Sequence, residues 1–410
     1  MTKLRKPELL IPAGNLEKLR TAVLYGANAV YTGIPGLSLR AGSAEMSLSD
    51  LDVSISYAHV NHVKVYGAIN TFARNLDLIE VGRIIPQLSA LNIDALIVSD
   101  PGIIRLIRTL APDIAIHLST QANTTNAEAV RFWCDQGVKR VVLARELNLK
   151  EITEIAAVVP EMELEMFVHG AMCMAYSGRC FLSAWRNNRS ANQGDCTQPC
   201  RWEYKISEST RPDDPLVMEE DDRYTYLLSS KDLCLIEYLP ELLASGITSL
   251  KIEGRMKSSY YVAVVTRTYR QALDALLADP VNFQPNSQWR HELTKVSNRG
   301  YTTGFAFAEE KIAATNPHVN YVQTHEPAGT VLKCDATHKR ILLEVKNHLT
   351  ADQELEILLP KSTIKIEADA MTDLDGNKVK EAHSGNRIYL PLEAEAPQGT
   401  LVRKIIGQTE

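Results

Sequence analysis

Short apolar runs alternate with amphipathic stretches along the first 255 residues of the chain. Eight of these runs combine β-branched, leucine and aromatic residues over about five positions, which is the length and composition of a buried strand. Between most of them, apolar residues recur at helical spacing, as in 16–23 and 126–133. The expected strands span residues 9–13, 29–33, 64–70, 95–99, 114–118, 140–144, 164–168 and 249–253. Continuous apolar strands that alternate with helices predict a parallel sheet, and eight such units predict a closed (β/α)8 barrel of the TIM type.

The spacing of the expected strands breaks once. Roughly 80 residues separate the seventh strand from the eighth, whereas the earlier strands follow one another at intervals of about 20 to 35 residues. We therefore expect a cysteine-bearing insertion after strand 7, over residues 171–235. Loops that follow strand ends build the active sites of such barrels, so the position of the insertion favours a functional role. No glycine-rich GxGxxG turn follows the first strand, which argues against a dinucleotide-binding sheet.

The pattern changes after the eighth strand. Residues 260–278 have the apolar spacing of a long helix, and prolines at 280 and 285 follow it. From about residue 318 onwards, short strand-like runs alternate with turn sequences such as DLDG at 373–376. We predict a barrel domain over 1–280, a linker or helical connection over 281–317 and a small all-β barrel domain over 318–410.

The composition is that of an ordinary soluble protein, with 45% hydrophobic residues, 23% charged residues and a formal net charge of −6. No apolar run approaches the length of about 18 residues that a membrane-spanning helix needs, and the start of the sequence lacks a signal-peptide pattern. We therefore expect a cytoplasmic protein, in which stable disulfides are unusual. The segment 173–205 is locally basic, with five cationic against two acidic residues, which is compatible with RNA binding or with a solvated loop.

Four of the seven cysteines lie close together in the insertion: Cys173, Cys180, Cys196 and Cys200. Crowded thiolates repel one another unless a metal, a cluster or a disulfide takes up the charge. The gaps of six, fifteen and three residues do not form the two close pairs of a usual structural zinc site. Irregular spacing on loops favours an iron–sulfur cluster, with zinc or neither as alternatives and Cys234 as a candidate replacement for Cys200. A cysteine nucleophile with His169 as its base would leave three cysteines unexplained.

Polar residues follow the ends of the expected strands. Because the carboxyl ends of parallel strands meet at one face of the barrel, these side chains should share a single mouth. The cations among them suggest an anionic ligand such as a carboxylate or phosphate, although each one taken singly is also compatible with a structural salt bridge. The expected mouth residues are Arg40, Asn70, Asp100, Gln121, Asn123, Arg145, Glu146, His169, Glu253, Arg255 and Lys257.

Several runs of the sequence resemble the collagenase-like peptidase family, the unclassified peptidase family thirty-two. The most specific of them is EMFVHGAMC at 165–173, continued by GRCFLS at 178–183. The other matching runs are PELLIPAG at 7–14, GANAVYTG at 26–33, STQAN at 119–123, KIEGR at 251–255 and RGYTTG at 299–304. The run NQGDCTQPCRW at 192–202 is most similar to a branch of the family that hydroxylates tRNA. This resemblance implies formation of 5-hydroxyuridine at the tRNA wobble position, with prephenate rather than dioxygen as the source of the hydroxyl group.

The resemblance also implies a cofactor and alternative activities. Cys173, Cys180 and Cys196 match the ligands of a 4Fe–4S cluster in the family, Cys200 matches the tRNA branch, and Cys234 lies nearer the position used by a branch that acts in ubiquinone synthesis. A further branch hydroxylates a ribosomal RNA cytidine. A collagenase-like peptidase remains an alternative, although the sequence contains neither an HExxH zinc motif nor a GxSxG elbow.

The expected site residues follow from both lines of reasoning. Arg40, Arg145 and Arg255 are suited to the two carboxylates of prephenate, while Tyr176 and Trp202 are suited to stacking an unpaired uridine. The expected catalytic residues are His169, Tyr176 and Glu253, and the expected substrate-binding residues are Arg40, Asn70, Gln121, Asn123, Arg145, Glu146, Arg179, Trp202, Lys231 and Arg255. The expected partners are tRNA and prephenate, with no membrane association. A homo-oligomer or a paralogous partner stays open.

Overall fold

The structure is a computed structural model that describes residues 6–38, 46–173, 180, 182–187, 189, 197–199, 231–307 and 322–406. Its barrel strands are β1 (Glu8–Pro12), β2 (Ala29–Gly33), β3 (Lys64–Ile69), β4 (Ala95–Val98), β5 (Ala115–Leu118), β6 (Arg140–Val142), β7 (Glu163–Ala171) and β9 (Ser249–Ile252). Each strand pairs in parallel with the next, and β9 pairs with both β7 and β1, so the sheet closes on itself. Each of the eight strands expected from the sequence is present, and the prediction of a TIM-type barrel is confirmed.

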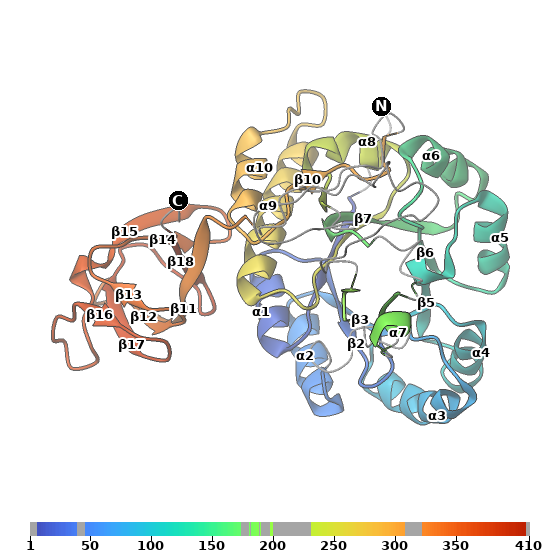
Figure 1. The fold of residues 1–410 in the computed structure, drawn as a ribbon, viewed down its shortest axis with the longest axis horizontal. Helices are drawn as coiled ribbons and strands as arrows, with labels where there is room; N and C mark the ends of the chain where they lie inside the picture. Colours follow the sequence, from blue (N-terminus) through green and yellow to red (C-terminus); the bar gives the residue numbers. More distant parts are fainter. Residues whose placement is uncertain are drawn as a thin grey trace, which may run out of the picture.

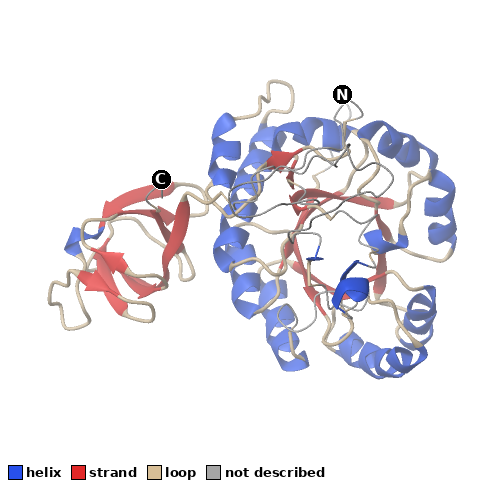
Figure 2. Cartoon of the chain, viewed as in Figure 1, coloured by secondary structure: helices blue, strands red, loops and turns tan. Residues whose placement is uncertain are grey.

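Helices surround the barrel strands, as Figure 2 shows. They are α1 (Leu16–Leu24), α2 (Leu48–Val60), α3 (Asn75–Ala90), α4 (Pro101–Leu110), α5 (Ala127–Asp135), α6 (Leu149–Val158), α8 (Leu239–Ala244) and α9 (Ser259–Ala278). Most of them begin after a side chain that accepts a backbone N–H of the first turn, as Asn15, Ser47 and Asn126 do. None of the helices in the described part of the chain is long and apolar enough to cross a membrane.

Two further strands extend the sheet beyond the barrel. β8 (Asp232–Cys234) runs antiparallel to the end of β7, with His169 opposite Cys234 and Ala171 opposite Asp232. β10 (Tyr301–Thr302) pairs in parallel with β8. The buried Arg299 donates through Nη2 to Oδ1 of Asp232 at 2.6 Å, which fixes the start of β8. After the insertion, the chain therefore returns as β8 and pairs with the end of β7. The sequence pattern did not predict this arrangement.

Gly170 allows β7 and β9 to approach each other beside His169. Its φ of +104° lies in the region that favours glycine, and a Cβ at this position would lie 2.6 Å from the backbone oxygen of Glu253. Replacing Gly170 with alanine should therefore lower the free energy of unfolding by about 2–4 kcal/mol, since backbone strain and a backbone clash add together. Urea denaturation followed by circular dichroism measures the change.

Gly82 provides the matched control for this substitution. It lies inside α3, and a Cβ built there meets nothing within 4 Å. Gly82→Ala should raise the free energy of unfolding by about 0.5–1 kcal/mol, because alanine is the better helix former. Equal effects of the two substitutions would contradict the strained backbone at Gly170.

Charged side chains fill the barrel near the amino ends of its strands. Arg140 contacts Glu165 at 3.1 Å and Glu163 at 2.7 Å, and it also pairs with Glu8. Lys251 donates from Nζ to Oε1 of Glu165 at 2.7 Å. Glu165 is fully buried, and burial acts to raise the pKa of its carboxyl, but Lys251 and Arg140 outweigh burial and hold that pKa at about 2. The carboxylate therefore stays ionised inside the barrel.

The segment 281–317, which the sequence analysis assigned to a connection, packs against the barrel where it is described. It contains α10 (Ser287–Thr294) as well as β10. Leu293, Val296 and Ala306 belong to the same apolar core as the barrel. Residues that follow the last barrel helix therefore complete the barrel's packing.

A second domain follows, drawn in orange and red in Figure 1. Its antiparallel sheet has the order β15 (Thr363–Glu367), β14 (Glu354–Leu358), β18 (Leu401–Ile405), β11 (His325–Asp335), β12 (Arg340–Val345) and β17 (Arg387–Pro391). A separate ribbon pairs β13 (Leu349–Thr350) with β16 (Glu381–Ala382). The sheet curves like half of a barrel around its own core, in which Val331, Leu343, Ile357 and Val402 are fully buried. The predicted all-β domain is thus present.

Polar contacts join this domain to the barrel helices α1 and α10. The hydroxyl of Tyr25, which follows α1, donates to the backbone oxygen of Leu358 at 2.7 Å and accepts the N–H of Leu401 at 3.0 Å. The fully buried Arg403 of β18 reaches Glu292 of α10 at 2.7 Å. These buried contacts position the second domain against the side of the barrel, as seen in Figure 1.

Candidate active site at the barrel mouth

The predicted cysteine segment starts at the end of β7. Cys173 is exposed and lies two residues beyond that strand, and Cys180 is partly exposed. The sulfur of Cys180 accepts the backbone N–H of Leu182 at 3.4 Å, at the start of the short helix α7 (Leu182–Asn187). Hydrogen bonds of this kind stabilise a thiolate, so Cys180 is suited to ligating a metal or cluster.

The helix α7 brings two parts of the cysteine segment together. The hydroxyl of Ser183 accepts the backbone N–H of Thr197 at 3.1 Å, and the side-chain amide of Asn187 donates to Oγ1 of Thr197 at 2.7 Å. Ser183 lies three residues after Cys180, and Thr197 directly follows Cys196. These hydrogen bonds hold Thr197 against α7, the helix that begins two residues after Cys180.

Several predicted site residues lie outside the described residues, so their roles remain predictions. They are Arg40, Tyr176, Arg179, Cys196, Cys200 and Trp202. Cys173 and Cys180 fit the expected cofactor in their chemistry, because both are at least partly exposed and the sulfur of Cys180 already accepts a hydrogen bond.

Cys234, the alternative fourth ligand, has the environment of a core cysteine. It is buried in β8, and burial raises the pKa of its thiol to about 11. A thiol with such a pKa is protonated at neutral pH, whereas a ligand must be a thiolate. The choice between Cys200 and Cys234 as the fourth ligand stays a prediction.

His169 lies in the core beside Cys234. Its ring centroid is 5.4 Å from that of Tyr301 and 5.5 Å from that of Tyr269, and the side chain is 1% exposed. Burial lowers the pKa of the imidazole to about 3, so the ring is neutral at physiological pH. Its predicted catalytic role remains untested, and this environment suits a positioning role better than proton transfer at the surface of the mouth.

Glu253 follows β9 and is held by its backbone. The N–H of Glu253 donates to the backbone oxygen of His169 at 2.8 Å, and the hydroxyl of Tyr261 donates to the backbone oxygen of Glu253 at 2.7 Å. The side chain is partly exposed. Its negative charge contributes, after burial, to the raised pKa values of Tyr31 and Tyr261, so the carboxylate lies at the inner edge of the mouth.

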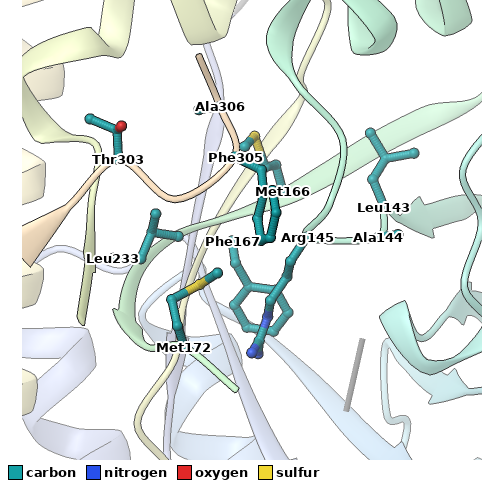
Figure 3. Close-up of a pocket in the computed structure, with 10 residues that line it drawn as sticks. All are labelled: Leu143, Ala144, Arg145, Met166, Phe167, Met172, Leu233, Thr303, Phe305 and Ala306. Atoms are coloured by element: carbon teal, nitrogen blue, oxygen red, sulfur yellow. The ribbon is translucent and has the colours of Figure 1, made fainter. Parts of the chain in front are cut away.

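Arg145 lies over the ring of Phe167, with its guanidinium carbon 4.2 Å from the ring centroid (Figure 3). Its Nε is buried and has no hydrogen-bond partner among the described residues. A buried guanidinium N–H without a partner is costly, and an anionic ligand would satisfy it. Arg145 borders a mainly apolar pocket, which Leu143, Ala144, Met166, Phe167, Met172, Leu233, Thr303, Phe305 and Ala306 also line.

Arg255 also acts electrostatically on Tyr31. The arginine is buried, and its Nη1 donates to the hydroxyl of Ser38 at 3.2 Å. The phenol of Tyr31 is fully buried, and its pKa, raised mainly by burial, is lowered in part by both Arg145 and Arg255. The two arginines therefore act on a common region of the mouth.

Amide side chains complete this region. Gln121 is buried in the short 3-10 helix Thr120–Ala122, and Asn123 follows it with a left-handed φ of 54°. The Oδ1 of Asn123 is buried without a hydrogen-bond partner among the described residues. Partly exposed positions at strand ends are taken by Asn70, Glu146 and Lys231.

Two residues of the expected mouth form hydrogen bonds with backbone groups that stabilise the fold. Asp100 caps α4, accepting the N–H of Ile103 at 3.0 Å. Lys257 donates to the backbone oxygen of Ser297 at 3.3 Å.

The sequence analysis missed the charged and aromatic lining of the barrel below the mouth. The Nζ of Lys251 lies 4.6 Å from the ring centroid of Tyr31 and 5.4 Å from that of Phe167. These residues connect the buried Glu165 to the arginines of the mouth. A signal was present, since Glu163 and Glu165 alternate with apolar residues, as Ser249, Lys251 and Glu253 do, and this places them on one face of their strands.

Comparison with known proteins agrees with this architecture over nearly the whole chain. The models of peptidase family U32 and of its C-terminal domain match residues 14–316 and 323–403. The chain is 37% identical over 406 residues to tRNA hydroxylation protein P1 of Bacillus subtilis, covering 98% of this chain and 95% of that protein. It is 36% identical over 448 residues to tRNA hydroxylation protein P of Escherichia coli, covering 98% of each. A protein of Porphyromonas gingivalis named collagenase is 34% identical over 309 residues, covering 73% of each chain. Both domains, including the cysteine segment within the barrel domain, thus fall within the matched regions, and the chain belongs to peptidase family U32.

Proposed function

We propose that this chain hydroxylates tRNA, forming 5-hydroxyuridine at the wobble position with prephenate as the source of the hydroxyl group. The observation that carries the proposal is the similarity to tRNA hydroxylation protein P of Escherichia coli, which covers 98% of both chains. Similarity over both domains supports a shared substrate class more strongly than a match to the barrel alone. The arrangement of cations, amides and cysteines at the barrel mouth is compatible with this chemistry.

The mouth supports binding of a small dianion. Arg145 has a buried N–H without a partner among the described residues, and Arg255 is held by its hydrogen bond to Ser38. Two guanidinium groups in one region suit a ligand with two carboxylates, since each carboxylate accepts charge-assisted hydrogen bonds. In the proposed complex, Arg145 and Arg255 hold the two carboxylates of prephenate, and Arg40 is a further proposed partner of these carboxylates.

The uridine would enter from the side of the amide residues. The buried Oδ1 of Asn123 is an acceptor suited to the N3–H of uracil, and Gln121 lies beside it in the same 3-10 turn. Tyr176 and Trp202 are the proposed stacking partners of the unpaired base. Glu253, at the inner edge of the mouth, is the proposed acceptor of the C5 proton that hydroxylation displaces.

A 4Fe–4S cluster is the proposed cofactor, with Cys173, Cys180, Cys196 and Cys200 as its ligands. When bound, such a cluster supplies one-electron redox chemistry or holds its loop in place. Zinc held by the same thiolates is the alternative. The contact of α7 with Thr197 supports the shared ligand set, because it joins the chain beside Cys180 to the chain beside Cys196.

Mass spectrometry of tRNA nucleosides tests the proposed activity. A strain that lacks this gene should lose 5-hydroxyuridine and regain it on complementation with the wild-type chain. In a strain that cannot make prephenate, the nucleoside should be absent until prephenate is supplied. Unchanged 5-hydroxyuridine in the deletion strain would reject the tRNA activity. Loss on deletion combined with indifference to prephenate would reject only the hydroxyl donor.

The same strains separate the alternative functions. Loss of a hydroxylated cytidine from ribosomal RNA, or of ubiquinone under anaerobic growth, would identify a sister activity. The peptidase alternative is favoured by the relative named collagenase. It predicts gelatin hydrolysis by the purified chain, which Cys173→Ser abolishes.

Replacing Arg145 with alanine should reduce kcat/KM for the prephenate-dependent reaction about 10–100-fold, because a hydrogen bond to a charged group contributes about 1.5–3 kcal/mol. The effect should appear mainly as a higher KM for prephenate. Arg145→Lys should recover only part of the activity, since an ammonium lacks the paired donors of a guanidinium. Arg131→Ala is the matched control, because Arg131 pairs with Glu128 on the exposed face of α5. An unchanged KM in Arg145→Ala would remove Arg145 from the binding site.

A further inference from the structure

Three potential metal ligands meet on the outer face of the β13–β16 ribbon, in the second domain. In this ribbon Leu349 lies opposite Ala382 and Thr350 opposite Glu381. The next pair outward along the same register is His348 and His383. Leu349 and Ala382 are buried, so the alternation of side chains places His348, Glu381 and His383 together on the opposite, exposed face. Residues more than 30 positions apart in the sequence are thereby collected at one point.

The donor atoms of these residues already lie close together. The Nε2 of His348 is 3.2 Å from Oε2 of Glu381, and the rings of His348 and His383 are stacked with centroids 4.9 Å apart. One donor atom from each residue lies within 4.8 Å of the others. Tetrahedral zinc with bonds of about 2.0–2.2 Å separates its ligand atoms by roughly 3.4 Å. All three side chains are exposed, so small rotations of the two rings are enough to reach that separation.

The surroundings of the ribbon do not oppose a cation. The Nζ of Lys404 donates to the backbone oxygen of His348, which fixes the start of β13. The charge of Lys404 is matched by Glu326 at 3.2 Å. Without a metal, His348 and Glu381 form an ordinary exposed ion pair when the histidine is protonated, and such pairs contribute little to stability.

We propose that His348, Glu381 and His383 bind one divalent transition metal ion, with zinc preferred and water at the fourth position. Two imidazoles and a carboxylate are a ligand set that zinc accepts, whereas calcium and magnesium require oxygen ligands. The ion would clamp the short β13–β16 ribbon, which is held by only two registered residue pairs. The site lies on the second domain, apart from the barrel mouth (Figure 1), and it does not depend on the proposed hydroxylation.

Zinc titration of the full chain, in competition with a chromophoric chelator, tests this site. Wild-type protein should bind one equivalent of Zn²⁺ more than the double variant His348→Ala/His383→Ala. The single variants His348→Ala, His383→Ala and Glu381→Gln should weaken that equivalent at least about tenfold, since the loss of outer-sphere partners alone costs about 10–100-fold. The cysteine segment can also bind zinc, but it is the same in every variant and cancels in the difference.

His338→Ala is the matched control. His338 is an exposed histidine of the same domain, with Nδ1 2.8 Å from Asp335, and it has no place in the cluster. It should bind zinc as the wild type does. Titration with Co²⁺ gives an independent readout, because the ion bound at this site should lack the thiolate charge-transfer absorption of a cysteine site. Equal zinc stoichiometry in the wild type and the double variant, or an equal loss in His338→Ala, would overturn the proposal.

Discussion

Replacing Cys180 with alanine should leave a folded barrel that no longer hydroxylates tRNA. The 5-hydroxyuridine content of tRNA should fall to less than about one hundredth of the wild-type level, since Cys180 is a proposed cluster ligand and removing a ligand costs more than the 10–100-fold typical of outer-sphere partners. Cys180 is partly exposed, and its sulfur accepts one backbone N–H, so the substitution removes little packing. Complementation of the deletion strain measures the nucleoside, and the iron and acid-labile sulfide of anaerobically purified protein measure the cofactor.

Cys334→Ala is the matched control for Cys180→Ala. Cys334 is a free, partly exposed cysteine in β11, far along the chain from the cysteine segment. This variant should keep both the modified nucleoside and the bound iron. Full hydroxylation by Cys180→Ala would rule out Cys180 as a required ligand. Loss of iron together with normal hydroxylation would show that the bound iron does not take part in the reaction.

Replacing Glu165 with glutamine should lower the free energy of unfolding by about 3–5 kcal/mol, because it leaves a buried ammonium without an anionic partner. Lys251 is fully buried and pairs with Glu165 at 2.7 Å. Adding Lys251→Met to Glu165→Gln should restore part of the lost stability, since an apolar side chain replaces the stranded charge. Urea denaturation at neutral pH compares the variants. Greater damage in the double variant than in the single one would contradict this explanation.

Glu163→Gln is the matched control. Glu163 also contacts Arg140, at 2.7 Å, but its side chain is 38% exposed. The expected loss of stability is therefore at most about 1 kcal/mol.

The contribution of Glu165 should depend on pH in a defined direction. Lys251 and Arg140 outweigh burial and lower the pKa of Glu165 to about 2 in the folded chain, whereas an unfolded glutamate titrates near about 4.3. The stabilisation is fully present above the unfolded pKa and is lost as the pH falls towards 2. The stability difference between wild type and Glu165→Gln should therefore shrink between about pH 4.5 and pH 2.

The strands of the barrel were predictable because each carries enough buried apolar residues to be recognised locally. β8 and β10 were missed for the opposite reason. β8 has three residues and β10 has two, and both depend on pairing with strands that are distant in sequence. The sequence located the insertion by its length, but it could not indicate that the chain returns antiparallel to β7.

The candidate site was predictable where strand ends determined it. Arg145, Arg255, Asn123 and Glu253 lie around the mouth because parallel strands end at the same face. The environments of His169 and Cys234 could not be read from the sequence, since the burial of these two residues results from β8 and from the tyrosines around them. The ligand cluster on the β13–β16 ribbon was missed because it depends on the cross-strand register.

The pairing of Ala171 with Asp232 has a consequence for how the insertion can vary among related proteins. About 60 residues lie between these two positions, and their ends are held side by side on one strand. The entropy of closing a loop grows only with the logarithm of its length, so doubling this one would cost about 0.6 kcal/mol. The length of the intervening segment can therefore change during evolution at almost no thermodynamic cost to the barrel that carries it.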